Sequence, residues 1–119
     1  MTKFLNSNTL TKRQEESARI LKKHPTRIPI ICERSTSCTS KYIMDIDKTK
    51  YLVPMDMLIG QFIYVVRKRI DIAKNEALFI FVNNRILPPS SELVANVYSQ
   101  YKDNDGFLYM QYNSENTFG

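Results

Sequence analysis

An apolar stripe between residues 59 and 70 restricts the fold of this chain more than any other feature. Apolar side chains recur there at intervals of three and four residues, which is the spacing of one buried face of an α-helix. They are Ile59, Phe62, Ile63, Val66 and Ile70. The segments on both sides are rich in β-branched and aromatic residues, so the chain is predicted to pack one central helix against a sheet.

Two strands are predicted before this helix. Residues 27–33 and 48–53 form a hairpin in which a long, Ser/Thr-rich loop joins the strands. Pro29 cannot donate a hydrogen bond to a β-ladder. It is therefore expected either at a sheet edge or with its missing donor pointing outward.

Two further strands and a short helix are predicted after it. Residues 77–82 are apolar on both faces, as is typical of a central strand, and Asn83–Asn84 suit the positive φ angles of a tight turn. Residues 93–101 form a short amphipathic helix, and the Pro and Ser residues at 88–90 suit its start. Residues 107–112 form the last strand.

An additional helix is predicted near the N-terminus. The spacing of Thr11 and Gln14 is that of a capping box, and Pro25 follows the end of the helical segment at Lys23. The segment has few apolar residues, so it should cover a core from outside. The order of hairpin, helix, strand, short helix and strand is that of an α+β, ubiquitin-like β-grasp fold, with a four-stranded mixed sheet around the central helix.

Length and composition fit a single domain over residues 1–119. Residues 1–26 would form an N-terminal helical extension, and residues 113–119 a flexible tail. No apolar run approaches the roughly 20 residues of a membrane-spanning helix, and the N-terminus lacks a secretory apolar region. We therefore expect a cytoplasmic protein.

The reactive residue types do not predict an enzyme. Cys32 and Cys38 have only His24 nearby, which gives neither a zinc site nor a disulfide framework, so both are expected to be reduced. The sequence has no nucleophile–base constellation and no Gly-rich phosphate loop. No cofactor or metal is expected, and the net charge of +5 favours an acidic partner of any of several kinds.

Four blocks of sequence, in a fixed order, carry a resemblance to one family. They are KKHPTRIPIICER, DKTKYLVPMDMLIGQFIYVVRKRI, EALFIFVNN, and GFLYMQY with a terminal FG. Together they resemble the autophagy ubiquitin-like modifiers, the relatives of microtubule-associated light chain 3 and the GABA-receptor-associated protein. The likeness runs from about Leu10 to Gly119 and is interrupted mainly by the loop before Asp45.

The resemblance implies conjugation through a C-terminal glycine. Gly119 would be activated through thioesters and joined to phosphatidylethanolamine on autophagosomal membranes. A glycine puts no side chain beside the carboxylate under attack, and the polar tail before it should be mobile. By resemblance, Arg27 and Phe118 contact the conjugation machinery. The implied partners are activating and conjugating enzymes and a processing or delipidating cysteine protease.

The resemblance also implies binding of receptor peptides that contain an aromatic residue, two spacers and an aliphatic residue. Such a peptide would add as a strand to the edge formed by residues 48–53. Its aromatic residue would enter a pocket lined by Glu16, Ile20, Pro29, Ile31, Lys48, Lys50, Leu52 and Phe107. Its aliphatic residue would enter a pocket lined by Tyr51, Leu52, Met57, Phe62, Val65 and Arg69.

The sequence departs from the family pattern at three places. His24 stands where tyrosine is usual, and the loop from Ser35 to Met44 is longer and more polar. Leu58 stands at a helix start where Ser or Thr is usual. Its missing side-chain oxygen would cost ~1 kcal/mol, unless Asp56 caps an earlier start.

Two other functions remain open at this point. The chain could be a peptide-binding adaptor that is never conjugated. It could also be a basic module that binds microtubules or nucleic acid through its first helix, although the modifier interpretation predicts no nucleic-acid partner. The cations of that helix are Lys12, Arg13, Arg19, Lys22 and Lys23.

Overall fold

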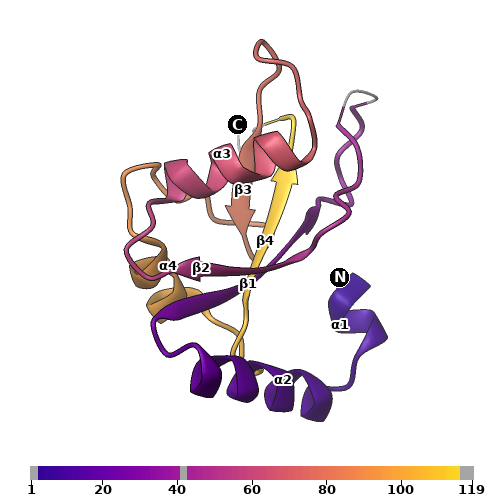
Figure 1. Ribbon diagram of the computed structural model, residues 1–119. Coiled ribbons are helices and arrows are strands. Elements are labelled where there is room, and N and C mark those ends of the chain that lie inside the picture. The colour runs from indigo at the N-terminus through magenta and orange to yellow at the C-terminus, as the bar shows by residue number, and fades with distance from the viewer. Residues whose placement is uncertain (1–2, 41–42, 116–119) are drawn as a thin grey trace.

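A computed structural model describes residues 3–40 and 43–115 of the chain (Figure 1). Its helices and strands, in chain order, are α1 (Lys3–Ser7), α2 (Leu10–Lys23), β1 (Arg27–Arg34), β2 (Lys50–Pro54), α3 (Ile59–Arg69), β3 (Phe79–Val82), α4 (Val94–Tyr101) and β4 (Leu108–Asn113). The strands form one mixed sheet in the order β2-β1-β4-β3, in which only β1 and β4 are parallel. The predicted ubiquitin-like β-grasp fold is confirmed.

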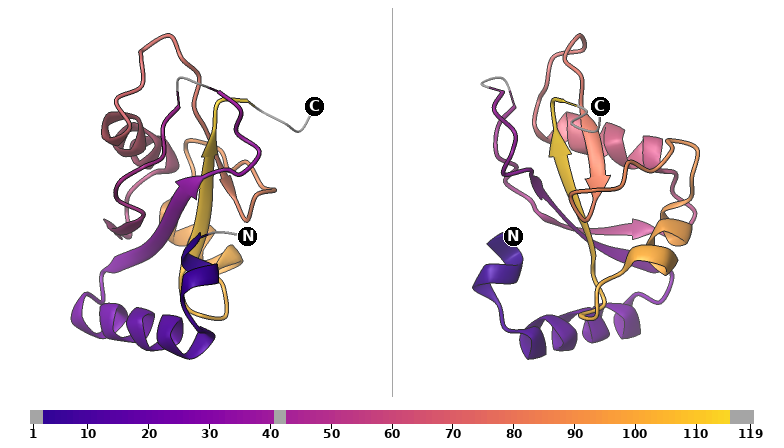
Figure 2. Two further views of the ribbon diagram at one scale, coloured as in Figure 1. Left: turned by 90° about the vertical axis from the view of Figure 1, so that its right-hand side faces the viewer. Right: turned by 180° about the vertical axis from the view of Figure 1, so that it is seen from behind.

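Helices lie over both faces of the sheet (Figure 2), and buried side chains form a core on each face. On one face, α3 buries Ile59, Phe62 and Val66 against the sheet, as the apolar stripe predicts. On the other face, α1 and α2 cover a smaller cluster that includes Ile31 and Phe107. Because both faces are covered, β1 has six consecutive buried residues and does not alternate between buried and exposed positions.

Pro29 does not lie at a sheet edge, so that alternative is wrong. It lies in β1, which has β2 on one side and β4 on the other. Since Cys32 donates to Thr49 on the β2 side, the alternation along the strand points the nitrogen of Pro29 toward β4. Pairing with β4 starts only at Ile30, so the missing donor of Pro29 lies just outside the ladder.

The prediction that residues 77–82 form a central strand is also wrong, because β3 is an edge strand. The face of β3 that carries Phe81 is apolar for another reason. Phe81 is buried there and lines a hollow together with Ser35, Thr36 and Ser37 of the loop that follows β1. Asn83 and Asn84 follow β3 with φ angles of 53° and 57°, as predicted.

The starts of the helices differ from the sequence-based prediction. The N-cap of α2 is Thr9, not Thr11, and its side-chain oxygen accepts a hydrogen bond from the N–H of Lys12 at 3.2 Å. α4 starts at Val94 after the N-cap Leu93, later than the Pro and Ser residues at 88–90. Those residues belong to the turn before the helix.

Leu58 is the N-cap of α3, and Asp56 does not cap it. Main-chain carbonyls satisfy the first donors of the helix instead. The N–H groups of Ile59 and Gly60 donate to the carbonyls of Glu92 and Ser90, each at 2.9 Å. In return, the N–H of Val94 at the start of α4 donates to the carbonyl of Met57 at 2.8 Å. The two helix starts therefore cap each other.

Candidate functional site

The outer edge of β2 is open to another strand. Antiparallel strands turn the main-chain groups of successive residues alternately toward and away from the partner. Because Cys32 donates to Thr49 at 2.8 Å, the pattern leaves the main-chain groups of Lys50 and Leu52 facing away from β1. Arg27 Nη1 donates to the carbonyl of Leu52 at 3.0 Å, so one side chain already uses this edge.

The structure brings together most of the residues predicted for the aromatic pocket. They lie on the face of the sheet that α1 and α2 cover. Lys50 Nζ lies 2.6 and 2.7 Å from the two carboxylate oxygens of Glu16, which joins β2 to α2. Ile20 packs against the cluster that includes Ile31 and Phe107. Pro29 and Leu52 lie opposite each other in the neighbouring register position.

Two side chains of α1 pack against the same cluster. The Phe4 ring makes an edge-to-face contact with Phe107, with 5.3 Å between the ring centroids. Lys50 Nζ lies 5.5 Å from the Phe4 ring centroid. Leu5 also packs against the cluster, and Ile31 and Phe107 are each 0% exposed. Phe4 and Leu5 therefore cover part of the cluster formed by Ile31, Phe107 and Tyr109.

The residues predicted for the aliphatic pocket do not all lie together, because some belong to the core and others line a surface hollow. Tyr51 and Phe62 belong to the main core, with their rings edge to face at 5.5 Å. Met57 and Val65 line a shallow hollow of about 620 Å³ between the end of β2 and α3. Lys48, predicted for the other pocket, has its Nζ 5.1 Å from the Tyr51 ring centroid.

Arg69, the remaining residue predicted for the aliphatic pocket, pairs with Asp47 on the surface. Its Nε and Nη2 lie 2.8 and 3.1 Å from the carboxylate oxygens. The hydrogen bond from Arg69 lowers the pKa of Asp47 below its usual range. A peptide that needs Arg69 for an acidic residue would have to compete with Asp47.

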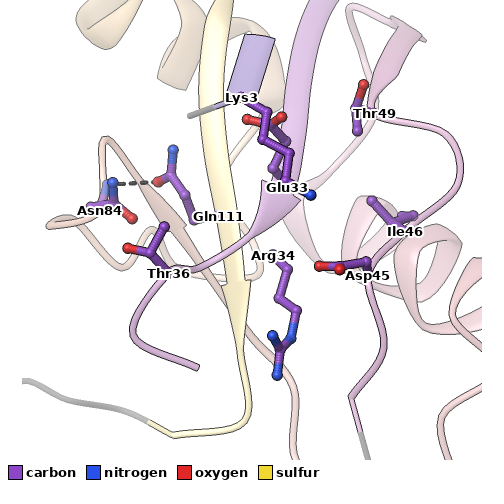
Figure 3. A pocket seen from close by; sticks show the side chains of 9 residues that line it. All are labelled: Lys3, Glu33, Arg34, Thr36, Asp45, Ile46, Thr49, Asn84 and Gln111. Atoms are coloured by element: carbon purple, nitrogen blue, oxygen red, sulfur yellow. Dashed lines mark hydrogen bonds between the residues drawn. The ribbon is translucent and has the colours of Figure 1, made fainter. Parts of the chain in front are cut away.

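A small, better enclosed cleft lies at the far end of β1 (Figure 3). Its volume is about 80 Å³, and it contains none of the residues predicted for the two peptide pockets. Glu33 is 7% exposed, and its Oε2 accepts a hydrogen bond from the N–H of Phe4 at 3.3 Å. Lys3 lies over Glu33 in Figure 3, so this cleft borders the place where α1 is held.

A buried ion pair joins α2 to the turn before β4, and sequence reasoning missed it. Arg13 Nη1 lies 2.7 Å from Asp105 Oδ2, and the Tyr109 hydroxyl donates to the same carboxylate. Burial raises the pKa of Tyr109, and the hydrogen bond to Asp105 adds to this effect. The Arg13 side chain is only 12% exposed, so it is not one of the free surface cations of α2.

The other sequence-based assignments have the following positions. Cys32 is in β1 and Cys38 in the loop after it, as predicted, and both are free and buried. Burial raises the pKa of the Cys32 thiol. Within residues 3–40 and 43–115, no cluster of side chains could hold a metal ion, and no helix is long and apolar enough to cross a bilayer. Phe118 and Gly119 lie outside the described residues.

The mixed sheet, the helix across one face and the open strand edge define a ubiquitin-like protein. The family model described as "Autophagy protein Atg8 ubiquitin like" matches residues 12–119. The chain belongs to this family, whose members are ubiquitin-like modifiers of autophagy and not catalysts.

Three relatives illustrate the similarity. Autophagy-related protein 8d of Arabidopsis thaliana is 51% identical over 119 residues, covering 100% of this chain and 96% of the relative. Autophagy-related protein 8 of Kluyveromyces lactis is 56% identical over 116 residues, covering 98% and 90%. The crystal structure of Trypanosoma brucei ATG8 superposes with a TM-score of 0.89 at 44% identity, covering 100% of this chain and 99% of that one.

Proposed function

We propose that this chain is a modifier that is joined through Gly119 to phosphatidylethanolamine and that recruits receptors through aromatic-x-x-aliphatic motifs. Membership of the Atg8 family supports both parts of the proposal. The chain would be cytoplasmic until its attachment to the autophagosomal membrane. Its partners would be the activating and conjugating enzymes, the processing cysteine protease and the motif-bearing receptors, with Arg27 and Phe118 contacting the conjugation machinery.

The open edge of β2 is the observation that carries the peptide-binding part. The main-chain groups of Lys50 and Leu52 face away from β1, and an extended peptide can add there as a fifth strand. Successive side chains of a strand point to opposite faces of the sheet, so the aromatic and aliphatic residues of the motif, three positions apart, point to opposite faces. One would point at the Phe107 cluster and another at the hollow beside Met57 and Val65.

The expected affinity is micromolar. Burying a tryptophan of 150–250 Å² at about 25 cal/mol/Å² contributes roughly 4–6 kcal/mol before costs. The aliphatic residue and the main-chain hydrogen bonds of the added strand contribute further, and immobilising the free peptide offsets part of the total. A net binding free energy of about −8 kcal/mol corresponds to a micromolar dissociation constant.

The conjugation part is tested by intact-mass measurement. The protein and its Gly119→Ala variant are incubated with Atg8-family conjugation enzymes, ATP and phosphatidylethanolamine liposomes. We expect a mass gain of one lipid in the unsubstituted chain and none in the variant. If enzymes that are active on a known substrate add no lipid, the chain is a peptide adaptor that acts without conjugation.

Calorimetric titration with a Trp-x-x-Leu peptide tests the binding part. Leu52→Arg should weaken binding at least about tenfold, because it changes the edge and the adjoining pocket. Leu87→Arg is the matched control, since Leu87 is exposed and lies in neither predicted pocket. Equal affinities of the two variants would refute this assignment of the edge.

Salt dependence separates peptide binding from a basic-module function. Binding to nucleic acid or another polyanion weakens steeply as salt is added, whereas burial of an aromatic side chain does not. Titrations of the peptide and of a polyanion at low and high salt therefore distinguish the two.

A further inference from the structure

The cleft at the far end of β1 has an acceptor and a donor on neighbouring strands of its floor. Glu33 and Gln111 lie directly opposite each other in the parallel pairing of β1 with β4, and they are 7% and 3% exposed. Both line the cleft, whose volume is about 80 Å³. A single water needs only ~10–15 Å³, so the cleft has room for a group of several atoms.

The acceptor is the second carboxylate oxygen of Glu33. Oε2 accepts the N–H of Phe4 at 3.3 Å, whereas Oε1 is buried and has no hydrogen-bond partner among the described residues. A carboxylate can accept about four hydrogen bonds. A buried acceptor that lacks a donor costs free energy, so a ligand that donates to Oε1 removes that cost.

The donor is the side-chain amide of Gln111. Its Oε1 accepts the N–H of Asn84 at 2.6 Å, which fixes the orientation of the amide (Figure 3). Among the nine residues drawn in that figure, this is the only hydrogen bond. The N–H groups of Gln111 Nε2 are therefore available to a ligand in the cleft.

The charges around the cleft do not suit a simple ion. Lys3, Arg34 and Asp45 line it together with Glu33, so two cations accompany two carboxylates. Lys3 lies over Glu33 in Figure 3, and the described structure has no ion pair between them. An ammonium ligand would meet Lys3, and a carboxylate ligand would meet Glu33. A neutral group that carries both a donor and an acceptor avoids both repulsions.

We propose that this cleft binds the carboxamide of a glutamine side chain in a receptor peptide. The NH₂ group of the ligand donates to Glu33 Oε1, and its carbonyl oxygen accepts from Gln111 Nε2 or Lys3 Nζ. The inference rests on the peptide-binding part of the proposed function. Glutamine suits the cleft better than asparagine, because Glu33 and Gln111 are almost fully buried and only the longer side chain reaches them.

A peptide on the β2 edge would lead to this cleft at its N-terminal end. Its aromatic residue is expected near Lys50 and its aliphatic residue near Met57, so the peptide runs in the same direction as β2. The residues before the aromatic one therefore lie toward Thr49, which lines the cleft. Because β2 begins only at Lys50, that part of the peptide is not bound to the sheet and can turn toward Glu33.

Peptides that differ in one isosteric residue provide the first test. One series of Trp-x-x-Leu peptides carries a single glutamine at each position from two to six before Trp, and a second series carries glutamate instead. At one of these positions, glutamine should bind the full chain about tenfold more tightly, because the glutamate carboxylate faces Glu33. Equal affinity, or a preference for glutamate, at every position overturns the proposal.

Variants of the cleft show whether Glu33 causes the preference. Glu33→Gln keeps an oxygen for the N–H of Phe4 and should abolish the preference for glutamine over glutamate. Asp45→Asn is the matched control, since it removes the same charge from an exposed residue of the same cleft and should keep the preference. If both variants abolish it equally, the effect belongs to the general charge of this surface and the proposal is wrong.

Propionamide tests the cleft without a peptide. Added to the unsubstituted chain, it should shift the main-chain NMR signals of Glu33 and Gln111 in a saturable way, and the Glu33→Gln variant should bind it more weakly. Shifts that rise linearly without saturation overturn the proposal, because they show that the cleft holds solvent only.

The tests also separate this proposal from the function on which it rests. If the peptides bind without any preference for glutamine, only the glutamine site fails. If no Trp-x-x-Leu peptide binds while propionamide saturates the cleft, the peptide-binding function is refuted and the cleft remains an amide-binding site.

Discussion

Replacement of Asp105 by alanine should destabilise the protein more than any surface substitution. The Asp105 side chain is fully buried and accepts hydrogen bonds from three groups. These donors are Arg13 Nη1 at 2.7 Å, the main-chain N–H of Phe107 at 2.8 Å and the hydroxyl of Tyr109. Asp105→Ala leaves all three without their acceptor, and one of them carries a charge.

The expected loss is about 3–5 kcal/mol, which is the usual cost of removing one partner of a buried ion pair. Most of this cost comes from the guanidinium of Arg13, because its side chain is only 12% exposed and water cannot fully replace the carboxylate. A domain of this size has a total stability of about 5–15 kcal/mol. The substitution should therefore remove a large share of that stability.

Urea unfolding followed by circular dichroism provides the measurement. With a slope of about 1–3 kcal/mol/M, the midpoint should fall by roughly 2 M. Asp105→Asn keeps the side-chain shape and serves as a second variant if the alanine variant does not fold. Asp47→Ala is the matched control, since it removes the exposed pair with Arg69 and should leave the midpoint unchanged. Similar midpoints for the Asp105 and Asp47 variants would contradict the reasoning.

Three further outcomes are expected. The pKa of Tyr109 is raised above its usual value of 10.0. Its contribution to stability is therefore present below about pH 10 and is lost as the pH rises through the folded-state pKa. Tyr109→Phe should flatten this alkaline fall in the free energy of unfolding. Cys32 and Cys38 are buried, so neither should react with a thiol reagent until the protein unfolds in urea, and fast labelling of the native protein would contradict their burial. Gly106 has a φ of 91°, and an added Cβ would clash with Ser17 Oγ, so Gly106→Ala should cost more than ~1 kcal/mol in a thermal melt.

The fold could be predicted because its strongest signals are local and periodic. The stripe from Ile59 to Ile70 can bury one helix face only, and the β-rich segments on both sides supply a sheet to receive it. The order of these segments then leaves few arrangements. The position of β3 was predicted wrongly because an apolar pattern reports burial but not what covers the strand. For Phe81 the cover is a loop and not another strand.

The contacts that determine the site were harder to predict, since they join segments far apart in the sequence. Asp105 lies in a polar loop and has no sequence signal that pairs it with Arg13. Leu58 has no capping oxygen, and the carbonyls of Glu92 and Ser90 that replace it could be found only from the fold. Phe4 did carry a signal, because it begins an apolar pair in a stretch, residues 2–9, that is otherwise polar. What that pair covers depends on the tertiary structure.

The position of β4 in the sheet has a consequence for how the protein is made. β4 is the last of the four strands along the chain, yet it lies between β1 and β3 and is hydrogen-bonded to both. During synthesis, the hairpin of β1 and β2 can form early, but β3 has no strand beside it until β4 has left the ribosome. Pairing β1 with β4 must also close a loop of more than 70 residues, and such long-range closure slows folding. The apolar segment Phe79–Val82 therefore waits without a partner strand during translation, and this is the stage at which the nascent chain is most exposed to aggregation.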